Sequence, residues 1–257
     1  MARGGYVGVG GVARKISKGY VGVNGIARKI IKAYIGVNGI ARPLWGYDKI
    51  TKYKWISRSD HGEDSVALTV GNYALIAGGE GGNGGSTSVS RTLDIISSSL
   101  TCSSSTLYTQ RKEFDGATIG NYAVFVGGVW EYSTGNDLSS SEAYNSSLSR
   151  TIPSSMSTTR HFHAVGTTGN YLVIAGGRNY NTDLKTVEAY SSSLTKITTS
   201  ISDLSEAKSR ISRAKVGNYI VFGGGETQGK YGTTTVDAYN SSLTRTIPSV
   251  SLSGSYC

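Results

Sequence analysis

The chain repeats itself at two different periods, and this constrains its fold more than any single residue does. The tripeptide Gly-Asn-Tyr recurs at spacings of 49, 49 and 48 residues, beginning at Gly71, Gly120, Gly169 and Gly217. Seven residues after each of these glycines comes a pair of glycines, and each unit later carries a segment similar to Ala-Tyr-Asn-Ser-Ser-Leu. Short apolar runs and glycines at a period of about 40–50 residues are typical of a β-propeller or a related array.

Each long unit has the pattern of four short strands. In the second unit they are predicted at 116–119, 122–126, 141–144 and 149–152. The run 122–126 is continuously apolar and stops at a glycine pair, as expected of a strand that is buried on both faces. We therefore predict an all-β chain, with four such units over residues 58–257.

A second repeat of 14 residues occupies residues 1–46. Each copy reads as strand, tight turn, strand, with Asn24-Gly25 and Asn38-Gly39 at two of the turns and Gly10-Gly11 at the first. Asn-Gly between alternating segments is a strong hairpin signal, because type I′ turns need positive φ. We predict three tandem β-hairpins here, followed by a junction at 47–57. Isolated hairpins are marginal in water, so they need a partner.

The positive charge lies almost entirely in this N-terminal arm. Residues 1–57 hold eleven Lys or Arg and one acid, Asp48, whereas the remaining 200 residues sum to −1 within a total of +9. Such an asymmetry indicates an acidic partner, although a merely solvated arm is an alternative. The residues expected to dock the arm are Arg14, Lys15, Arg28, Lys29 and Arg42. Neutralisation of nucleic-acid phosphates is a less favoured alternative, because the arm's tyrosines repeat at strand positions.

The long units resemble the kelch repeat family. The resemblance rests on strands that end in Gly-Gly, on Arg111 and Arg160 (with Lys208 as a looser match) before the first strand, and on the third-strand aromatics Tyr144, Tyr190 and Tyr239. The family's last-strand tryptophan is absent. The resemblance implies a β-propeller of about four blades over 58–257. A small closed ring is the favoured arrangement, and a fifth blade or an open fan completed by a second chain are the alternatives.

The whole chain also resembles tail or fibre proteins encoded by phages of Gram-positive bacteria. This resemblance rests on the copies of Tyr-Val-Gly-Val-Asn-Gly-Ile-Ala-Arg-Lys, which begin at Tyr20 in the clearest case. It implies a virion protein made in the bacterial host cytoplasm. Its partners would be other virion proteins, and it would form a homo-oligomer through the arm.

No motif in the chain predicts catalysis, a metal or another cofactor, and we expect a non-enzymatic protein. His161 and His163 occupy alternate positions of a predicted strand, which would place both imidazoles on one side. A structural or surface role is favoured for them, because kelch-like copper oxidases need more ligands. Arg111 and Arg160 fit salt bridges better than a sialidase triad. Cys102 and Cys257 are expected to be free thiols, and no apolar run is long enough to insert in a membrane.

The loops after the glycine pairs vary while the strands repeat, and such loops often carry binding specificity. Their aromatic and basic residues could stack on sugar rings and bind hydroxyl groups. The predicted ligand-binding residues are Trp130, Tyr132, Arg178, Tyr180 and Tyr231. The alternative is that they are ordinary loop residues. The leading functional hypothesis is a virion protein that displays a propeller to a bacterial surface, with carbohydrate as a candidate ligand. The alternative is a cellular kelch-type protein-interaction module.

Overall fold

The computed structural model describes residues 64–81, 88–131, 135–228, 232–249 and 251–254 in full, and of residues 1–57 only the backbones of six strands. The chain divides into two compact units, Met1–Ser57 and Arg58–Cys257. The boundary falls where the long repeats begin. Each unit is described by itself.

The N-terminal unit contains three antiparallel hairpins. They pair β1 (Tyr6–Val9) with β2 (Val12–Lys15), β3 (Tyr20–Val23) with β4 (Ile26–Lys29), and β5 (Ala33–Val37) with β6 (Ile40–Trp45). In each pairing two residues separate the strands, as the predicted turns require. The five basic residues expected to dock the arm lie in β2, β4 and β6. Their side chains lie outside the described residues, so their docking role stays a prediction.

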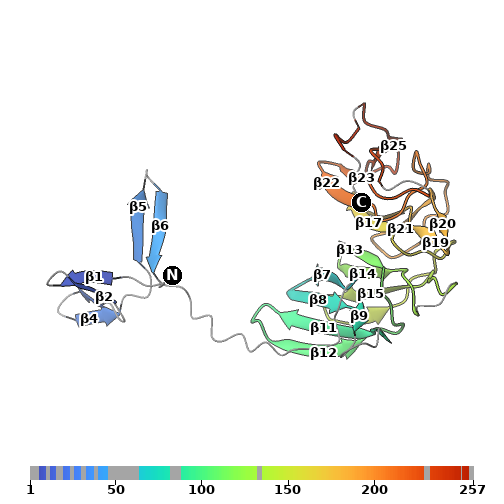
Figure 1. Cartoon of the computed structure of the whole chain (residues 1–257). Coiled ribbons are helices and arrows are strands. Elements are labelled where there is room, and N and C mark those ends of the chain that lie inside the picture. Colours follow the sequence, from blue (N-terminus) through green and yellow to red (C-terminus); the bar gives the residue numbers. More distant parts are fainter. Residues whose placement is uncertain are drawn as a thin grey trace. The chain divides into compact units, whose positions relative to one another are not determined.

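The second unit consists of four antiparallel sheets in chain order, one for each long repeat (Figure 1). The first sheet contains β7 (Val66–Val70), β8 (Tyr73–Ala77), β11 (Thr92–Ser97) and β12 (Cys102–Thr106). The second contains β13 (Asp115–Ile119), β14 (Tyr122–Val126), β15 (Ser141–Asn145) and β16 (Arg150–Thr151). The third contains β17 (Ala164–Thr168), β18 (Tyr171–Ala175) and β21 (Val187–Ser191). The fourth contains β22 (Ser212–Val216), β23 (Tyr219–Gly223), β24 (Val236–Tyr239) and β25 (Arg245–Thr246).

Two small hairpins follow the glycine pairs of the first and third repeats. They are β9 (Glu80–Gly81) with β10 (Ser88–Val89), and β19 (Arg178–Asn179) with β20 (Thr182–Asp183). The structure is all-β, with no helix among the described residues. No helix in the described part of the chain could therefore span a membrane.

The hairpin between the first two strands of each sheet is set by the Gly-Asn-Tyr repeat. Val70 pairs with Tyr73, so Gly71 and Asn72 form a two-residue turn. Gly71 has a φ of +54°, and the three equivalent glycines lie between +53° and +55°. Glycine at the first central position with positive φ is the requirement of a type II′ turn, whose twist matches the flanking strands. The repeated tripeptide therefore fixes the register of four hairpins.

The hydrophobic core lies between consecutive sheets rather than within one sheet. Three clusters of buried residues join the first sheet to the second, the second to the third, and the third to the fourth. Representative members are Leu75 with Phe125, Val126 with Ile174, and Ala175 with Phe222, all of which are fully buried. Because a sheet buries its faces only against its neighbours, stability depends on the array.

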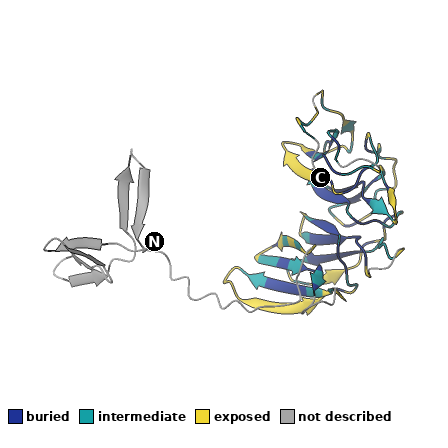
Figure 2. Cartoon of the chain, in the orientation of Figure 1, coloured by how far each residue is buried: buried dark blue, intermediate teal, exposed yellow. Residues whose placement is uncertain are grey.

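The four sheets follow one another around an arc, with their first strands β7, β13, β17 and β22 as neighbours (Figure 1). The favoured closed ring is not what this structure shows. Every residue of β22 is exposed (Figure 2), and Leu100 at the other end of the array is 71% exposed. Among the described residues, no fourth cluster joins the last sheet to the first, so the arc is open.

Candidate functional site: an acidic loop cavity

The loops after the glycine pairs of the second and third repeats line a cavity of about 160 Å³ that is open to the surface. We call it the loop cavity. Its walls come from the segments that enter β13 and β17 and from the loops that follow β14 and β18. They comprise Lys112, Glu113, Val129, Glu131, Gly135, Asn136, Asp137, His161, Tyr180 and Asn181. Two repeats contribute, so the site exists only when the sheets are packed side by side.

Asp137 connects the two repeats at this cavity. One carboxylate oxygen, Oδ2, accepts the backbone N–H of Tyr180 at 2.6 Å. The other, Oδ1, contacts Nδ1 of His161. Tyr180 lies at the tip of the β19–β20 hairpin with a φ of +54°, a conformation that non-glycine residues rarely adopt. The side chain of Asp137 therefore positions both the tyrosine and the imidazole.

The cavity carries more acidic than basic groups. The carboxylates of Glu113, Glu131 and Asp137 line it, against Lys112 and His161. The Lys112 ammonium lies 3.3 Å from Glu80 and 3.5 Å from Glu113, so neighbouring acids already neutralise it. Carboxylate oxygens accept hydrogen bonds only, so the lining suits a ligand that supplies donors: hydroxyl, ammonium or guanidinium groups.

Of the five residues predicted to bind ligand, the structure describes Trp130, Arg178 and Tyr180, and only Tyr180 of these three lines the cavity. Tyr180 lines the cavity and is 51% exposed. Trp130 is exposed, and its carbonyl accepts a hydrogen bond from Gln110 at 2.7 Å, but its side chain is not part of the lining. Tyr132 and Tyr231 lie outside the described residues.

Arg178, the remaining predicted residue, forms contacts within the frame. Its Nε donates to Asp183 at 2.8 Å and its Nη2 donates to Ser209 at 3.2 Å, with Glu226 at 3.7 Å. These contacts hold the β19–β20 hairpin that presents Tyr180. The prediction missed the carboxylates, because it followed aromatic residues in the loops. The sequence signal that could have indicated them is the charged pair Lys112-Glu113, which directly follows the repeated basic residue Arg111.

His161 and His163 do not face one side, so the predicted geometry was wrong. Both precede β17 rather than lying within it, and Phe162 between them has a φ of +51°, which breaks the alternation of an extended strand. His161 lines the loop cavity, whereas His163 lines a different cavity of about 290 Å³ near the first strands. The pKa of His163 lies well below 6.5. Burial of the imidazole is the largest cause, and the nearby positive charge of Arg160 is the second. The described residues contain no group of three potential metal ligands.

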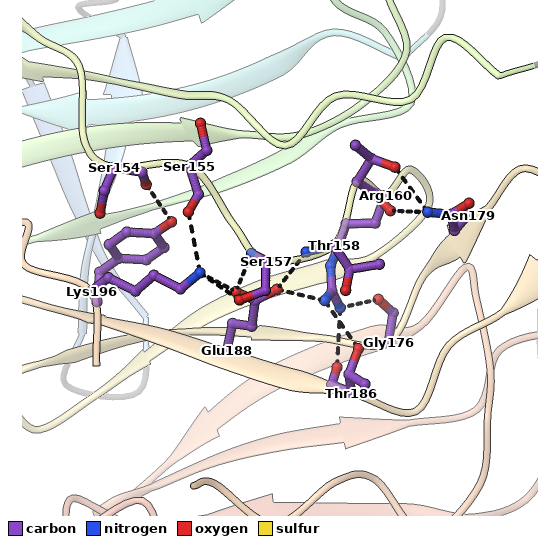
Figure 3. Close-up of polar contacts among 12 residues, drawn as sticks. Ser154, Ser155, Ser157, Thr158, Arg160, Gly176, Asn179, Thr186, Glu188 and Lys196 are labelled. Carbon is purple, nitrogen blue, oxygen red and sulfur yellow. Dashed lines mark hydrogen bonds and ion pairs between the residues drawn. The ribbon is translucent and has the colours of Figure 1, made fainter. Parts of the chain in front are cut away.

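Three buried basic residues stabilise the sheets beneath the loops: Arg111, Arg160 and Lys208. All three form salt bridges, which confirms the prediction made for the two arginines. Their partners are Glu142, Glu188 and Asp237 in the third strand of each sheet. Figure 3 shows the third repeat, where Arg160 donates to the carbonyls of Gly176 at 2.8 Å and Thr186 at 3.0 Å. Each basic side chain thus donates a hydrogen bond to a carbonyl in a glycine pair or next to a strand.

Glu188 is the acceptor at the centre of the same network. It accepts the N–H of Ser157 at 2.7 Å and lies 2.9 Å from the ammonium of Lys196 (Figure 3). Burial alone would raise the pKa of Glu188, but the Ser157 N–H, Lys196 and Arg160 outweigh it and lower the pKa. Burial lowers the pKa of Arg160 against the opposing effect of Glu188. Every charge here has a partner, as stable burial requires.

The third repeat is the part of the chain that matches a known family model. Residues 159–194 match the family model of the Kelch motif. The matched span contains Arg160, the glycine pair at Gly176 and Tyr190, the same features on which the sequence resemblance rests. No curated protein matches the chain. The Kelch match over these residues supports a relationship to kelch-repeat proteins, which are typically non-enzymatic interaction modules.

Proposed function

We propose that the chain is a non-enzymatic virion protein whose second unit binds a surface ligand through the loop cavity. The observation that carries the proposal is the convergence of two repeats on one acidic cavity, fixed by the contacts of Asp137 with Tyr180 and His161. Preformed concave sites with a few oriented polar groups are typical of ligand binding. Asp137 is occupied by positioning contacts, which favours binding over catalysis.

Carbohydrate on a bacterial surface is the ligand class that this lining favours. Sugar hydroxyls would donate to Glu113 and Glu131, and the half-exposed ring of Tyr180 offers a face on which a sugar ring can pack. The virion setting rests on the resemblance to phage tail and fibre proteins and on the charge of the arm, +10 over residues 1–57. The arm would dock the protein to other virion proteins.

A kelch-type interaction module with a protein ligand is the second candidate. The Kelch match favours it, and so does the acidic lining, which suits a Lys or Arg side chain of a partner protein. The two candidates use the same cavity but differ in their ligand. Competition between a soluble surface polysaccharide and a basic peptide therefore separates them.

Isothermal titration of the full chain tests the proposal. The titrants are cell-wall polysaccharide from a Gram-positive host and a lysine-rich peptide. Glu131→Gln and Tyr180→Ala should each weaken polysaccharide binding by about tenfold or more, the loss of roughly one charged hydrogen bond or one packed ring. Tyr108→Ala removes a tyrosine that is 67% exposed and is not part of the lining, and it is the matched control. Binding of the peptide alone would favour the second candidate. Binding that neither cavity variant changes would contradict both.

A further inference from the structure

The three interfaces between consecutive sheets are built from the same two halves. One half is the last residue of the first strand: Val70, Ile119 and Thr168 are 3%, 4% and 0% exposed. The other half is a leucine of the next repeat with a positive φ. Leu148 packs against the first cluster, Leu194 belongs to the second, and Leu243 packs against the third.

Two backbone contacts accompany each interface. The turn glycine of one repeat lies against a serine of the next: Gly71 against Ser146, Gly120 against Ser192, and Gly169 against Ser241. The second glycine of each pair also donates its N–H to the carbonyl of the following buried base. These bonds join Gly79 to Arg111, Gly128 to Arg160 and Gly177 to Lys208, each at 2.9 Å. The contacts occur at matching repeat positions, so the interface is a repeated structure.

The fourth sheet presents one half of this interface without its partner. Val216, which corresponds to Val70, is 61% exposed, and all five residues of β22 are exposed (Figure 2). No atom of the described residues outside the turn itself lies within 4 Å of the position that a Cβ on Gly217 would occupy. Among the described residues, the N–H of Gly225 makes no bond of the kind that Gly177 makes.

The first sheet presents the other half. Leu100 corresponds to Leu148 and has the same backbone conformation, with φ values of +59° and +61°. Yet Leu100 is 71% exposed, because no repeat precedes its own in the array. Ser98, the counterpart of Ser146, is exposed as well. The exposed leucine and the exposed valine are the two sides of a contact that the chain makes three times internally.

We propose that a second copy of the chain completes the array, with Leu100 of each copy packed on Val216 of the other. Both halves are exposed in the same chain, so one copy does not join its own ends. Two such contacts would relate two copies by a two-fold axis and close eight sheets into one ring, within the usual range of about four to eight for propellers. This interface lies in the second unit and is independent of the basic arm.

Light scattering of the full chain tests the assembly. The wild-type protein should have a multiple of the 27.1 kDa chain mass. Leu100→Arg and Val216→Arg should each halve that mass, because either charge would be buried in both contacts of the ring. Ile247→Arg is the matched control for Val216→Arg. Ile247 is a β-branched residue of the fourth repeat like Val216 and is 53% exposed, but it lies outside the contact. A monomeric wild type, or an unchanged mass in both variants, overturns the proposal.

Disulfide trapping then identifies the contact. Leu100→Cys and Val216→Cys are made separately in full chains in which Cys102 and Cys257 are replaced by serine. Oxidation should give a covalent dimer only when the two chains are mixed, because each Leu100 meets the Val216 of the other copy. No cross-link in the mixture, or cross-linking of either variant alone, contradicts this pairing. A chain with both cysteines should form a covalent dimer. An internally bridged monomer, or a ladder of longer products, overturns a closed dimer.

Discussion

The backbone N of Gly128 donates to the carbonyl of Arg160 at 2.9 Å, and this bond joins the glycine pair of the second repeat to the buried base that precedes the first strand of the third. The neighbouring Gly127 has a φ of +60°, and a Cβ there would lie 2.7 Å from the same carbonyl oxygen. The glycine pair is therefore required twice over, by backbone conformation and by the close approach of the next repeat.

Gly127→Ala should lower the free energy of unfolding by about 2–4 kcal/mol, because strain at positive φ adds to a clash with backbone that cannot yield. Gly135→Ala is the control: its φ is +90°, but no atom of the described residues that surround it lies within 4 Å of a Cβ there. It should lose only about 1 kcal/mol. Urea unfolding measures both. Equal losses would show that the approach of Arg160 contributes nothing.

Arg160→Met should destabilise the protein by about 3 kcal/mol or more, because it leaves Glu188 and the carbonyls of Gly176 and Thr186 without their buried donor. The matched control is Lys185→Met, which removes an exposed ion pair with Asp203 at 3.8 Å and should change stability by less than about 1 kcal/mol. Thermal unfolding compares the two. A loss in Arg160→Met no larger than in the control would contradict a structural role for the buried pair.

His163→Phe should flatten the dependence of stability on acid pH. Burial keeps His163 neutral in the folded state, whereas the unfolded side chain takes up a proton below its ordinary pKa of 6.5. The free energy of unfolding therefore falls as the pH decreases below 6.5, by up to about 1.4 kcal/mol per pH unit from this group. Phe114 occupies the same repeat position and shows that an aromatic ring fits there. Urea titrations from pH 7 to 5 with equal slopes in both proteins would refute this.

Asp137→Asn should loosen the loop cavity without unfolding the sheets. The neutral amide accepts the Tyr180 N–H more weakly and loses the charge beside His161. Hydrogen exchange at Tyr180 should accelerate by about tenfold, with little change at buried strands such as β18. Uniform acceleration over the whole second unit would mean that Asp137 supports the global fold rather than the cavity.

Deleting residues 1–57 should leave the second unit folded, because its three hydrophobic clusters consist entirely of residues within Arg58–Cys257. The truncated chain should keep a cooperative thermal transition, and its circular dichroism should lack a helical signal. Full-length protein measured at the same concentration is the reference. Aggregation or loss of the transition would show that the N-terminal hairpins contribute to the same core.

The sequence indicated the repeat frame well, because that frame depends on local backbone chemistry. Gly71 and its counterparts need positive φ in a turn, and the run at 122–126 can only be a buried strand, so both are visible without coordinates. The ion-pair roles of Arg111 and Arg160 followed from their repeat positions in the same way. The loop cavity could not be predicted in this way, because Asp137 and Tyr180 are 43 residues apart and meet only where two sheets pack together.

The sequence by itself determined the all-β character, the two periods and the four units, since turn and strand preferences act over a few residues. Only the tertiary structure decided which side chains share a cavity, that His161 and His163 diverge, and that Val216 and Leu100 are left exposed at the two ends of an open arc. Those outcomes depend on how many sheets pack together and through what angle. Nearly identical repeats carry no local signal of where their array stops, because each repeat encodes both halves of the same interface.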